Sequence, residues 1–199
     1  MKKLSRETQK RMILLLELLE SWKKEKITSN EIAENLGCKP DLVRWDLRFL
    51  DFEKGVSNGY KSAELQKAVR SALNCTGGEE LKKCCIVGLG RLGTALLDDG
   101  IFFGSGFKIV AGFDSSVNRV EMLRSTFELF PANRIESVVP QQGIEYALLC
   151  CAESEAQKMT DRLVRAGIKG IVNYTRSVLK VAAGIKIENV SPVLALQML

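Results

Sequence analysis

The run from Cys84 to Leu97 constrains the fold of this chain more than any other stretch. It is typical of a short apolar strand, a glycine-rich turn and the start of an amphipathic helix. The spacing of Gly88, Gly90 and Gly93 matches the dinucleotide-binding fingerprint. In that fingerprint the first glycine allows a tight turn, the second lets a pyrophosphate approach the backbone, and the third lets the helix pack closely on the strand. Phosphate charge would lie at the helix N-terminus.

An acidic residue stands where this fingerprint expects one. A second strand is predicted over 108–113, and it leads into Asp114, 21 positions after Gly93. In this fingerprint, an acidic residue about 20 positions after the glycines accepts hydrogen bonds from the adenosine ribose. A carboxylate there also repels a 2′-phosphate, so the sequence favours NAD over NADP. The alternative is that Asp114 only caps the next turn.

Strands and helices alternate through the rest of this region, which predicts an α/β Rossmann domain with a doubly wound parallel sheet. The further strands are expected near 135–138, 146–151, 171–174 and 186–190, with helices over 117–127, 154–166 and 193–199. The last helix is largely apolar, so it is expected to pack either on a second subunit or on its own domain.

The residue types that the chain lacks make some catalytic and metal-binding functions less favoured. The chain contains no histidine, and histidine is the commonest general acid–base residue. This favours a nucleotide that is bound rather than used, and a protein that is not an enzyme. The six cysteines fit no zinc spacing, so no metal is expected. They are predicted to be small buried residues, with thiol redox sensing as the alternative. The apolar runs are far short of the about 20 residues that span a bilayer, and we expect a cytoplasmic protein.

Positive charge is concentrated in residues 1–74, which hold 15 Lys and Arg against 11 Asp and Glu. A first helix is predicted over 6–22. A second begins with a capping box of Thr28 and Glu31 and ends at Gly37. A third begins at Pro40. This is a helix-turn-helix pattern, followed by turn-forming residues over 54–61 that are typical of a small wing.

The third helix is predicted to enter the major groove of DNA. Its buried stripe is expected to contain Leu42, Val43, Leu47 and Leu50. Its outer face would place Arg44 and Arg48 against bases or phosphates of the DNA, with three lysines contacting the DNA phosphate backbone. The predicted DNA-binding residues are Ser29, Lys39, Arg44, Trp45, Arg48, Lys54 and Lys61. The alternative is a helical domain with solvated charges, or one that binds protein, since Asp41, Asp46 and Asp51 dilute the local charge.

Three parts are therefore expected along the chain. Residues 1–74 form an α-rich winged helix-turn-helix domain that ends in a linking helix over 61–74. Residues 75–190 form the Rossmann domain, and the polar stretch 75–80 marks the boundary between the two. Residues 191–199 form a C-terminal helix.

This combination resembles the Rex family of NAD(H)-responsive transcriptional repressors over residues 4–199. The most specific motifs are SNEIAENLG at 29–37, VRWDL at 43–47, GY at 59–60, GLGRLGTAL at 88–96, AGFD at 111–114, AGIKGIVN at 166–173 and ENV at 188–190. The resemblance implies NAD(H) as the cofactor. The residues assigned to it are Gly88, Leu89, Gly90, Arg91, Leu92, Gly93, Asp114, Cys151 and Asn173.

The resemblance also implies a homodimer on a palindromic operator, with the C-terminal helix exchanged between subunits. In the family, NADH moves the DNA-reading domains off the operator, while NAD⁺ competes without releasing it. The predicted function is a repressor whose operator affinity follows the NADH/NAD⁺ ratio.

The sequence departs from the family pattern at positions that belong to the switch. A family tyrosine is replaced in the region of Asp98 and Asp99, and an aspartate by Ser191. Ala152 replaces a proline, and Thr175 with Arg176 replaces Ala-Pro; a buried Arg176 would need a partner. A Rex-like paralogue that binds DNA without responding to NADH is therefore the alternative, and a small NAD-dependent oxidoreductase is a third.

Overall fold

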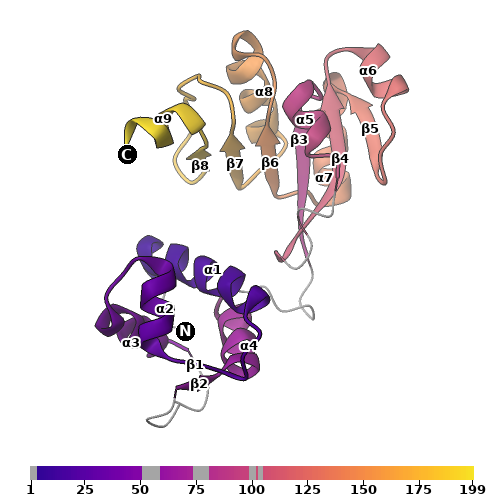
Figure 1. Cartoon of the computed structure of the whole chain (residues 1–199). Helices are drawn as coiled ribbons and strands as arrows, with labels where there is room; N and C mark the ends of the chain where they lie inside the picture. Colours follow the sequence, from indigo (N-terminus) through magenta and orange to yellow (C-terminus); the bar gives the residue numbers. More distant parts are fainter. Residues whose placement is uncertain (1–3, 51–58, 74–80, 99–101, 103–104) are drawn as a thin grey trace. The chain divides into compact units, whose positions relative to one another are not determined.

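The computed structural model describes residues 4–50, 59–73, 81–98, 102 and 105–199. The chain divides into two compact units, Met1–Glu79 and Glu80–Leu199, each of which is described by itself (Figure 1). The boundary predicted between residues 74 and 75, and the polar stretch 75–80, lie outside the described residues.

The first unit packs four helices around one apolar core, beside a two-stranded antiparallel ribbon. Its elements are α1 (Arg6–Ser21), β1 (Lys26–Ile27), α2 (Ser29–Leu36), α3 (Pro40–Leu47), β2 (Tyr60–Lys61) and α4 (Ser62–Ala72). Met12, Leu15, Leu16 and Leu19 of α1 are buried at helical spacing, and the helix, predicted over 6–22, ends at Ser21. The strand β1 was not predicted from the sequence.

Local sequence signals determine both ends of α2. The Thr28 hydroxyl accepts a hydrogen bond from the Glu31 backbone N–H at 3.2 Å, and the Glu31 carboxylate accepts one from the Thr28 N–H at 2.9 Å. At the other end, Gly37 adopts a left-handed conformation with φ of 64°. The predicted capping box and C-cap are therefore confirmed.

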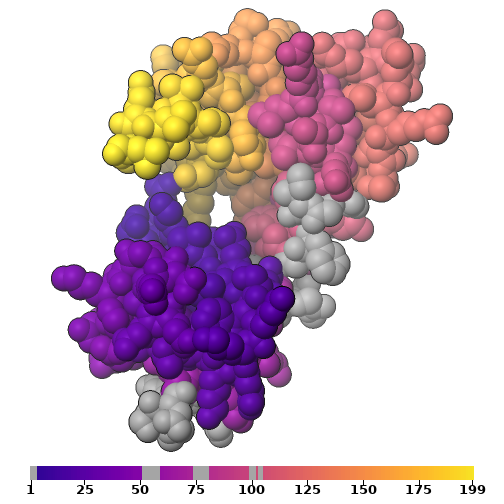
Figure 2. Space-filling view, in the orientation of Figure 1, coloured from indigo at the N-terminus to yellow at the C-terminus, as the bar shows by residue number. Residues whose placement is uncertain are grey.

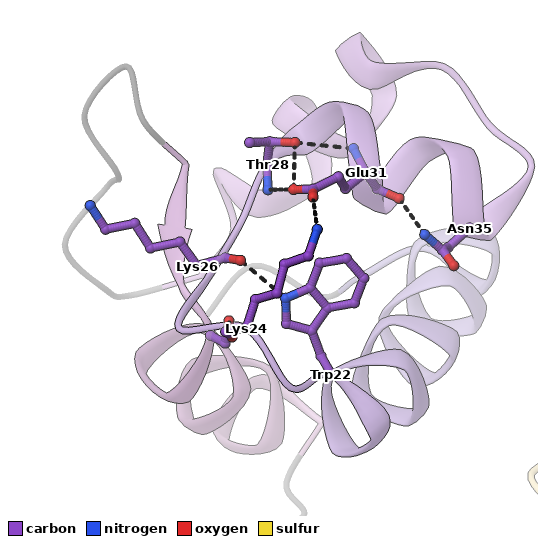
Figure 3. A network of polar contacts seen from close by, with 7 residues as sticks. Trp22, Lys24, Lys26, Thr28, Glu31 and Asn35 are labelled. Carbon is purple, nitrogen blue, oxygen red and sulfur yellow. Dashed lines mark hydrogen bonds and ion pairs between the residues drawn. The ribbon is translucent and has the colours of Figure 1, made fainter.

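Glu31 also holds α2 against the end of α1 and the strand β1 (Figure 3). The Lys24 ammonium donates to the Glu31 carboxylate at 2.9 Å and lies 5.2 Å from the centre of the Trp22 ring. The Trp22 indole N–H donates to the Lys26 carbonyl at 3.0 Å. The network joins the end of α1, β1 and α2, so it holds in place the start of α2, the first helix of the helix-turn-helix.

This network should make the stability of the first unit depend on acid pH. The hydrogen bond from Lys24, followed by those from Thr28, lowers the pKa of Glu31 from its ordinary 4.5 to about 2. A carboxylate with a lowered pKa stabilises the folded state above its unfolded pKa, and this contribution is lost as the pH falls toward the folded value. Denaturant unfolding from pH 7 to 2 should therefore show wild type more stable than Glu31→Gln, by a margin that shrinks below about pH 4.5. A margin that does not change with pH would contradict this role of Glu31.

Two expectations about α3 are wrong. Asp46 does not dilute the exposed charge, because it is buried. It accepts hydrogen bonds from the Thr8 hydroxyl at 3.1 Å and from Arg11 Nε and Nη2 at 2.5 and 3.0 Å. Leu42 lies at the edge of the buried stripe and is 36% exposed, whereas Val43 and Leu47 are buried as expected.

The second unit contains a six-stranded parallel sheet, in the strand order β5-β4-β3-β6-β7-β8. Its elements are β3 (Lys82–Val87), α5 (Arg91–Ala95), β4 (Phe107–Asp114), α6 (Val117–Met122), β5 (Glu128–Pro131), the 3₁₀ helix η2 (Ala132–Arg134), α7 (Ile135–Gln142), β6 (Tyr146–Leu149), α8 (Glu153–Arg165), β7 (Gly170–Asn173), β8 (Lys186–Asn189) and α9 (Pro192–Gln197). This order is that of a doubly wound Rossmann sheet. The predicted fold class is confirmed.

Successive residues of β3 point to opposite faces of the sheet. Cys85 and Val87 join the core formed with α7 and α8, while Cys84 and Ile86 join the core on the other face. Burial raises the pKa of the Cys84 thiol to about 12. Since only the thiolate is reactive, this environment does not favour thiol redox sensing at Cys84.

The strand predicted over 135–138 is wrong, because these residues begin α7. Ile135, Val138 and Val139 are buried at helical spacing, and they pack in the same core as α8. The strand between α6 and α7 is instead β5, which pairs with β4. The helix predicted over 117–127 is correspondingly shorter and ends at Met122.

None of the helices within the described part of the chain combines the length and the apolar character that a bilayer crossing requires.

Candidate nucleotide pocket and DNA-binding face

A pocket of about 250 Å³ opens at the carboxyl ends of β3, β4 and β6. This is the place where the strand order reverses, between β3 and β6, and where open α/β sheets bind their ligands. The pocket is lined by Val87, Gly88, Gly90, Phe113, Asp114, Ser115, Arg119, Ala132, Cys150, Cys151, Ala152, Glu155 and Met159.

Two glycines of the fingerprint are required by the packing around the turn. Gly88 has a φ of 94°, and a Cβ on it would lie 2.4 Å from the backbone nitrogen of Cys151. A Cβ on Gly93 would lie 1.9 Å from the Gly88 carbonyl oxygen. Side chains are therefore excluded at both positions, and α5 begins directly against the end of β3.

Gly90 is different, because no packing excludes a side chain there. A Cβ on Gly90 would meet no atom within 4 Å, and the residue lines the pocket. It is also the N-cap of α5, whose first N–H groups have no partner within the helix. The absence of a side chain at Gly90 leaves room for a ligand to approach these groups. This cradle fits the pyrophosphate of a dinucleotide.

Asp114 connects the glycine-rich turn to the next strand. Its buried carboxylate accepts hydrogen bonds from the Leu89 N–H at 2.6 Å and from the Ser116 N–H at 2.7 Å. The second of these bonds caps the turn before α6, so the capping interpretation of Asp114 describes part of its role. A carboxylate has about four acceptor positions. Arg119 Nη1 also lies 3.4 Å from both oxygens, so about one position is left for a ribose hydroxyl.

Several residues of the pocket were not predicted from the sequence. Arg119 comes from α6, and its Nη1 lies 3.4 Å from both oxygens of Asp114. Ser115 follows β4, and Glu155 lies in the first turn of α8. Ser115 could have been found from the sequence, because it directly follows β4 and must lie at this edge of the sheet. Arg119 and Glu155 belong to α6 and α8, and only the fold brings them to the pocket.

Other residues predicted to bind the cofactor have different surroundings. Leu89 is buried beneath the turn, while the side chains of Arg91 and Leu92 are exposed on α5. Cys151 lines the pocket, and burial raises its pKa to about 11. Asn173 is buried, and its amide is bonded within the protein. The Asn173 partners are the Ser177 carbonyl, the Asn189 amide oxygen, and the N–H and hydroxyl of Thr175.

The possibility of a buried Arg176 beside the cofactor does not arise. Its side chain is 86% exposed and lies 3.8 Å from Glu153, at the start of α8. Thr175, by contrast, is tied into the turn by Asn173. The change from Ala-Pro to Thr-Arg therefore leaves an ordered turn and no buried charge.

The helix α3 presents a mixed basic and aromatic face to solvent. Arg44 donates to the Ser29 hydroxyl at 2.9 Å and to the Asp41 carboxylate at 2.6 Å. The Trp45 ring is 56% exposed, and the Arg48 guanidinium lies 5.3 Å from its centre. The structure therefore brings together four of the predicted DNA-binding residues at α3 and the start of α2.

The three predicted lysines are distributed around this helix-turn-helix. Lys39 is the exposed N-cap residue of α3. Lys61 ends β2, and its ammonium lies 2.8 Å from the Glu64 carboxylate. Lys54 lies outside the described residues, as does most of the predicted wing.

Potential metal ligands do not gather anywhere in the part of the chain that the structure describes. No group of three or more Cys, Asp or Glu residues there has the arrangement that holds a metal ion.

Comparisons with known proteins find one domain family and relatives of nearly the whole chain. The CoA binding domain family matches residues 79–177. A protein of Solidesulfovibrio magneticus named redox-sensing transcriptional repressor Rex is 33% identical over 187 residues, which cover 92% of this chain and 83% of the relative. A protein of the same name from Clostridium beijerinckii is 32% identical and covers 83% of this chain and 77% of the relative.

Solved structures of a Rex-family repressor called RSP give the same result. RSP in complex with β-NADH superposes with a TM-score of 0.86 at 28% identity, over 100% of this chain and 93% of RSP. RSP in complex with β-NAD⁺ and operator DNA also gives a TM-score of 0.86 at 28% identity, over 100% of this chain and 91% of RSP. Because a Rex relative is 33% identical over 92% of this chain, the chain belongs to the Rex family of redox-sensing transcriptional repressors.

Proposed function

We propose that this protein is a DNA-binding repressor whose operator affinity is set by the NADH/NAD⁺ ratio, and that it acts as a homodimer in the cytoplasm. The observation that carries the proposal is the open cradle at Gly90, beside the Asp114 carboxylate, in a chain that also contains a basic helix-turn-helix. The relatives are named as transcriptional repressors.

The pocket supports NAD(H) as the effector. Gly90 leaves space for the pyrophosphate, and the residual acceptor capacity of Asp114 suits the adenosine ribose. The nicotinamide half would then extend toward Cys151 and Ala152 at the end of β6. When bound, the nucleotide supplies a redox-dependent charge on its nicotinamide ring, which is neutral in NADH and cationic in NAD⁺. The solved relative binds β-NADH, and β-NAD⁺ together with operator DNA.

The helix-turn-helix supports DNA as the partner. The helix α3 places Arg44, Trp45 and Arg48 on one outward face, as recognition helices do. Ser29 at the start of α2 holds Arg44 from the neighbouring helix. The phosphate backbone attracts such cations without regard to sequence, whereas base edges are read in the groove.

Exposed apolar residues at the end of the chain support a homodimer. On α9, Val193, Leu194 and Leu196 are exposed, and this helix lies at the surface of the second unit (yellow in Figure 2). An apolar helix of this kind favours burial against a partner. Two-fold symmetry of the dimer then requires a palindromic operator.

Two other functions are weaker candidates. A paralogue that binds DNA without responding to NADH would account for Ser191, which here caps α9 by accepting from the Leu194 N–H at 3.2 Å. The open cradle at Gly90 argues against it. A small oxidoreductase would need a proton donor near the nicotinamide, and the chain has no histidine.

Nucleotide binding is the first test of the proposal. Calorimetric titration of the full chain with NADH and with NAD⁺ should show one site per chain for each, with NADPH weaker because of the Asp114 charge. A chain that binds neither NADH nor NAD⁺ would contradict the sensor function.

Asp41 should restrain DNA binding by the free protein. Its exposed carboxylate holds the Arg44 guanidinium, and this ion pair must open before Arg44 can reach a phosphate. Asp41→Asn removes a negative charge from the DNA-facing helix, so we expect affinity to rise by about 2- to 5-fold at low salt. Fluorescence anisotropy on a labelled duplex measures this change. Asp161→Asn, on α8 of the nucleotide unit, is the charge-matched control, and an equal gain in that variant would contradict the effect.

A further inference from the structure

The exposed indole on α3 is an unusual group for a surface helix. The first unit contains two tryptophans whose surroundings differ. Trp22 packs partly against its core and donates its indole N–H to Lys26. Trp45 is 56% exposed, and its ring makes a cation–π contact with Arg48. Packing of the core therefore does not account for the presence of Trp45.

Trp45 belongs to an apolar strip on α3 and the turn after it. Leu42 and Phe49 are 36% and 39% exposed, and their spacing from Trp45 places the three side chains on one side of the helix. Arg44 and Arg48 lie beside this strip. The outward face thus combines cations, which suit phosphates, with an apolar surface, which phosphates do not explain.

The major groove offers one apolar group on its floor, the C5 methyl of thymine. A recognition helix that lies in the groove turns its outward face toward the base edges. Trp45 lies near the middle of that face, with Arg48 and Arg44 on one side of it and Leu42 and Phe49 on the other. The Arg48 guanidinium lies 5.3 Å from the centre of the indole ring, and this cation–π contact restricts the indole, which lowers the entropy cost of placing it against a base.

We propose that Trp45 reads a thymine in each operator half-site by packing its indole on the C5 methyl. The proposal rests on the DNA-binding function proposed above, and it adds the kind of base that the helix selects. Recognition of this kind requires no hydrogen bond from the indole. It therefore predicts discrimination by a methyl group alone.

Deoxyuridine differs from thymidine only in lacking that methyl, so it isolates the proposed contact. A duplex would first be selected from a random 30-base-pair library with the full chain. Each thymine of one half-site would then be replaced in turn by deoxyuridine. Loss of one buried methyl should weaken wild-type binding by about 4-fold at one position, with smaller effects at the other thymines.

The variants show whether Trp45 is the residue that senses the methyl. With Trp45→Ala, the deoxyuridine duplex at that position should bind as well as the thymine duplex, whereas Trp45→Phe should retain part of the difference. Phe49→Ala is the matched control, because it shortens the same strip and should leave the methyl effect in place. Circular dichroism of each variant checks the fold.

Two results would overturn the inference. One is wild-type binding that no deoxyuridine substitution weakens, and the other is a methyl effect of the same size in Trp45→Ala. Failure of the library to yield any bound duplex would instead contradict the DNA-binding function itself, and the inference with it.

Discussion

Gly90→Val should remove NADH binding from a chain that still folds, with a loss in affinity of at least about 100-fold. The physical reason lies in the space around Gly90. A Cβ there meets no atom within 4 Å, and the φ of −71° is one that any L-residue adopts. The valine side chain therefore does not disturb the fold, but it projects into the room that the pyrophosphate needs.

The other two fingerprint glycines provide the contrast. Gly93→Ala places a methyl 1.9 Å from the Gly88 carbonyl oxygen, so it should destabilise the second unit as a whole. Calorimetry with NADH, together with the thermal unfolding temperature, separates the two cases: Gly90→Val keeps its unfolding temperature and Gly93→Ala does not. Unchanged NADH affinity in Gly90→Val would show that the nucleotide binds elsewhere.

Arg44→Ala should weaken operator binding by about 10-fold or more and reduce its salt dependence by about one unit of slope if Arg44 contacts a phosphate. Arg44 is already ordered on the outer face by Ser29 and Asp41. Its guanidinium is therefore close to its binding position before DNA arrives, and only the Asp41 contact must be exchanged.

The measurement is duplex affinity from 50 to 300 mM salt for wild type, Arg44→Ala and Arg165→Ala, with the slopes compared as above. Arg165 is an exposed arginine of α8 in the nucleotide unit, so its removal matches the charge change without altering α3. NADH affinity should be the same in all three proteins. Equal DNA affinity and slope in Arg44→Ala and wild type would contradict the assignment of α3 as the recognition helix.

Features set by neighbouring residues could be predicted from the sequence. The ends of α2 depend on Thr28, Glu31 and Gly37, which lie within ten positions of one another. The turn after β3 likewise depends on three glycines close together in the chain, and the structure shows why Gly88 and Gly93 cannot carry side chains.

Features set by distant residues could not be predicted in this way. Asp46 was expected at the surface because its partner Arg11 lies 35 positions away on α1. Arg119 and Glu155 reach the pocket only because α6 and α8 begin at the same edge of the sheet. Ile135 and Val138 fit a strand by composition, but they lie in α7, whose buried side packs in the same core as α8.

Asn173 shows that a family motif does not give the contacts that a residue makes in this chain. The family motif assigns it to the cofactor, and the structure shows its amide bonded to Thr175, Ser177 and Asn189. Its role in this chain is to hold the turn after β7 in place. Its place in the cofactor site stays a prediction, because the pocket lining does not include it and its amide is bonded within the protein.

The coupling between the two units is the central claim, and one measurement tests it most directly. The affinity for a selected operator duplex would be measured with saturating NADH and, separately, with saturating NAD⁺. NADH should weaken operator binding by between about 5- and 150-fold, the usual range of allosteric coupling, while NAD⁺ should leave the complex intact. By linkage, operator DNA should weaken NADH binding by the same factor, and Gly90→Val should abolish the response. Operator affinity that is the same with and without saturating NADH would contradict the account.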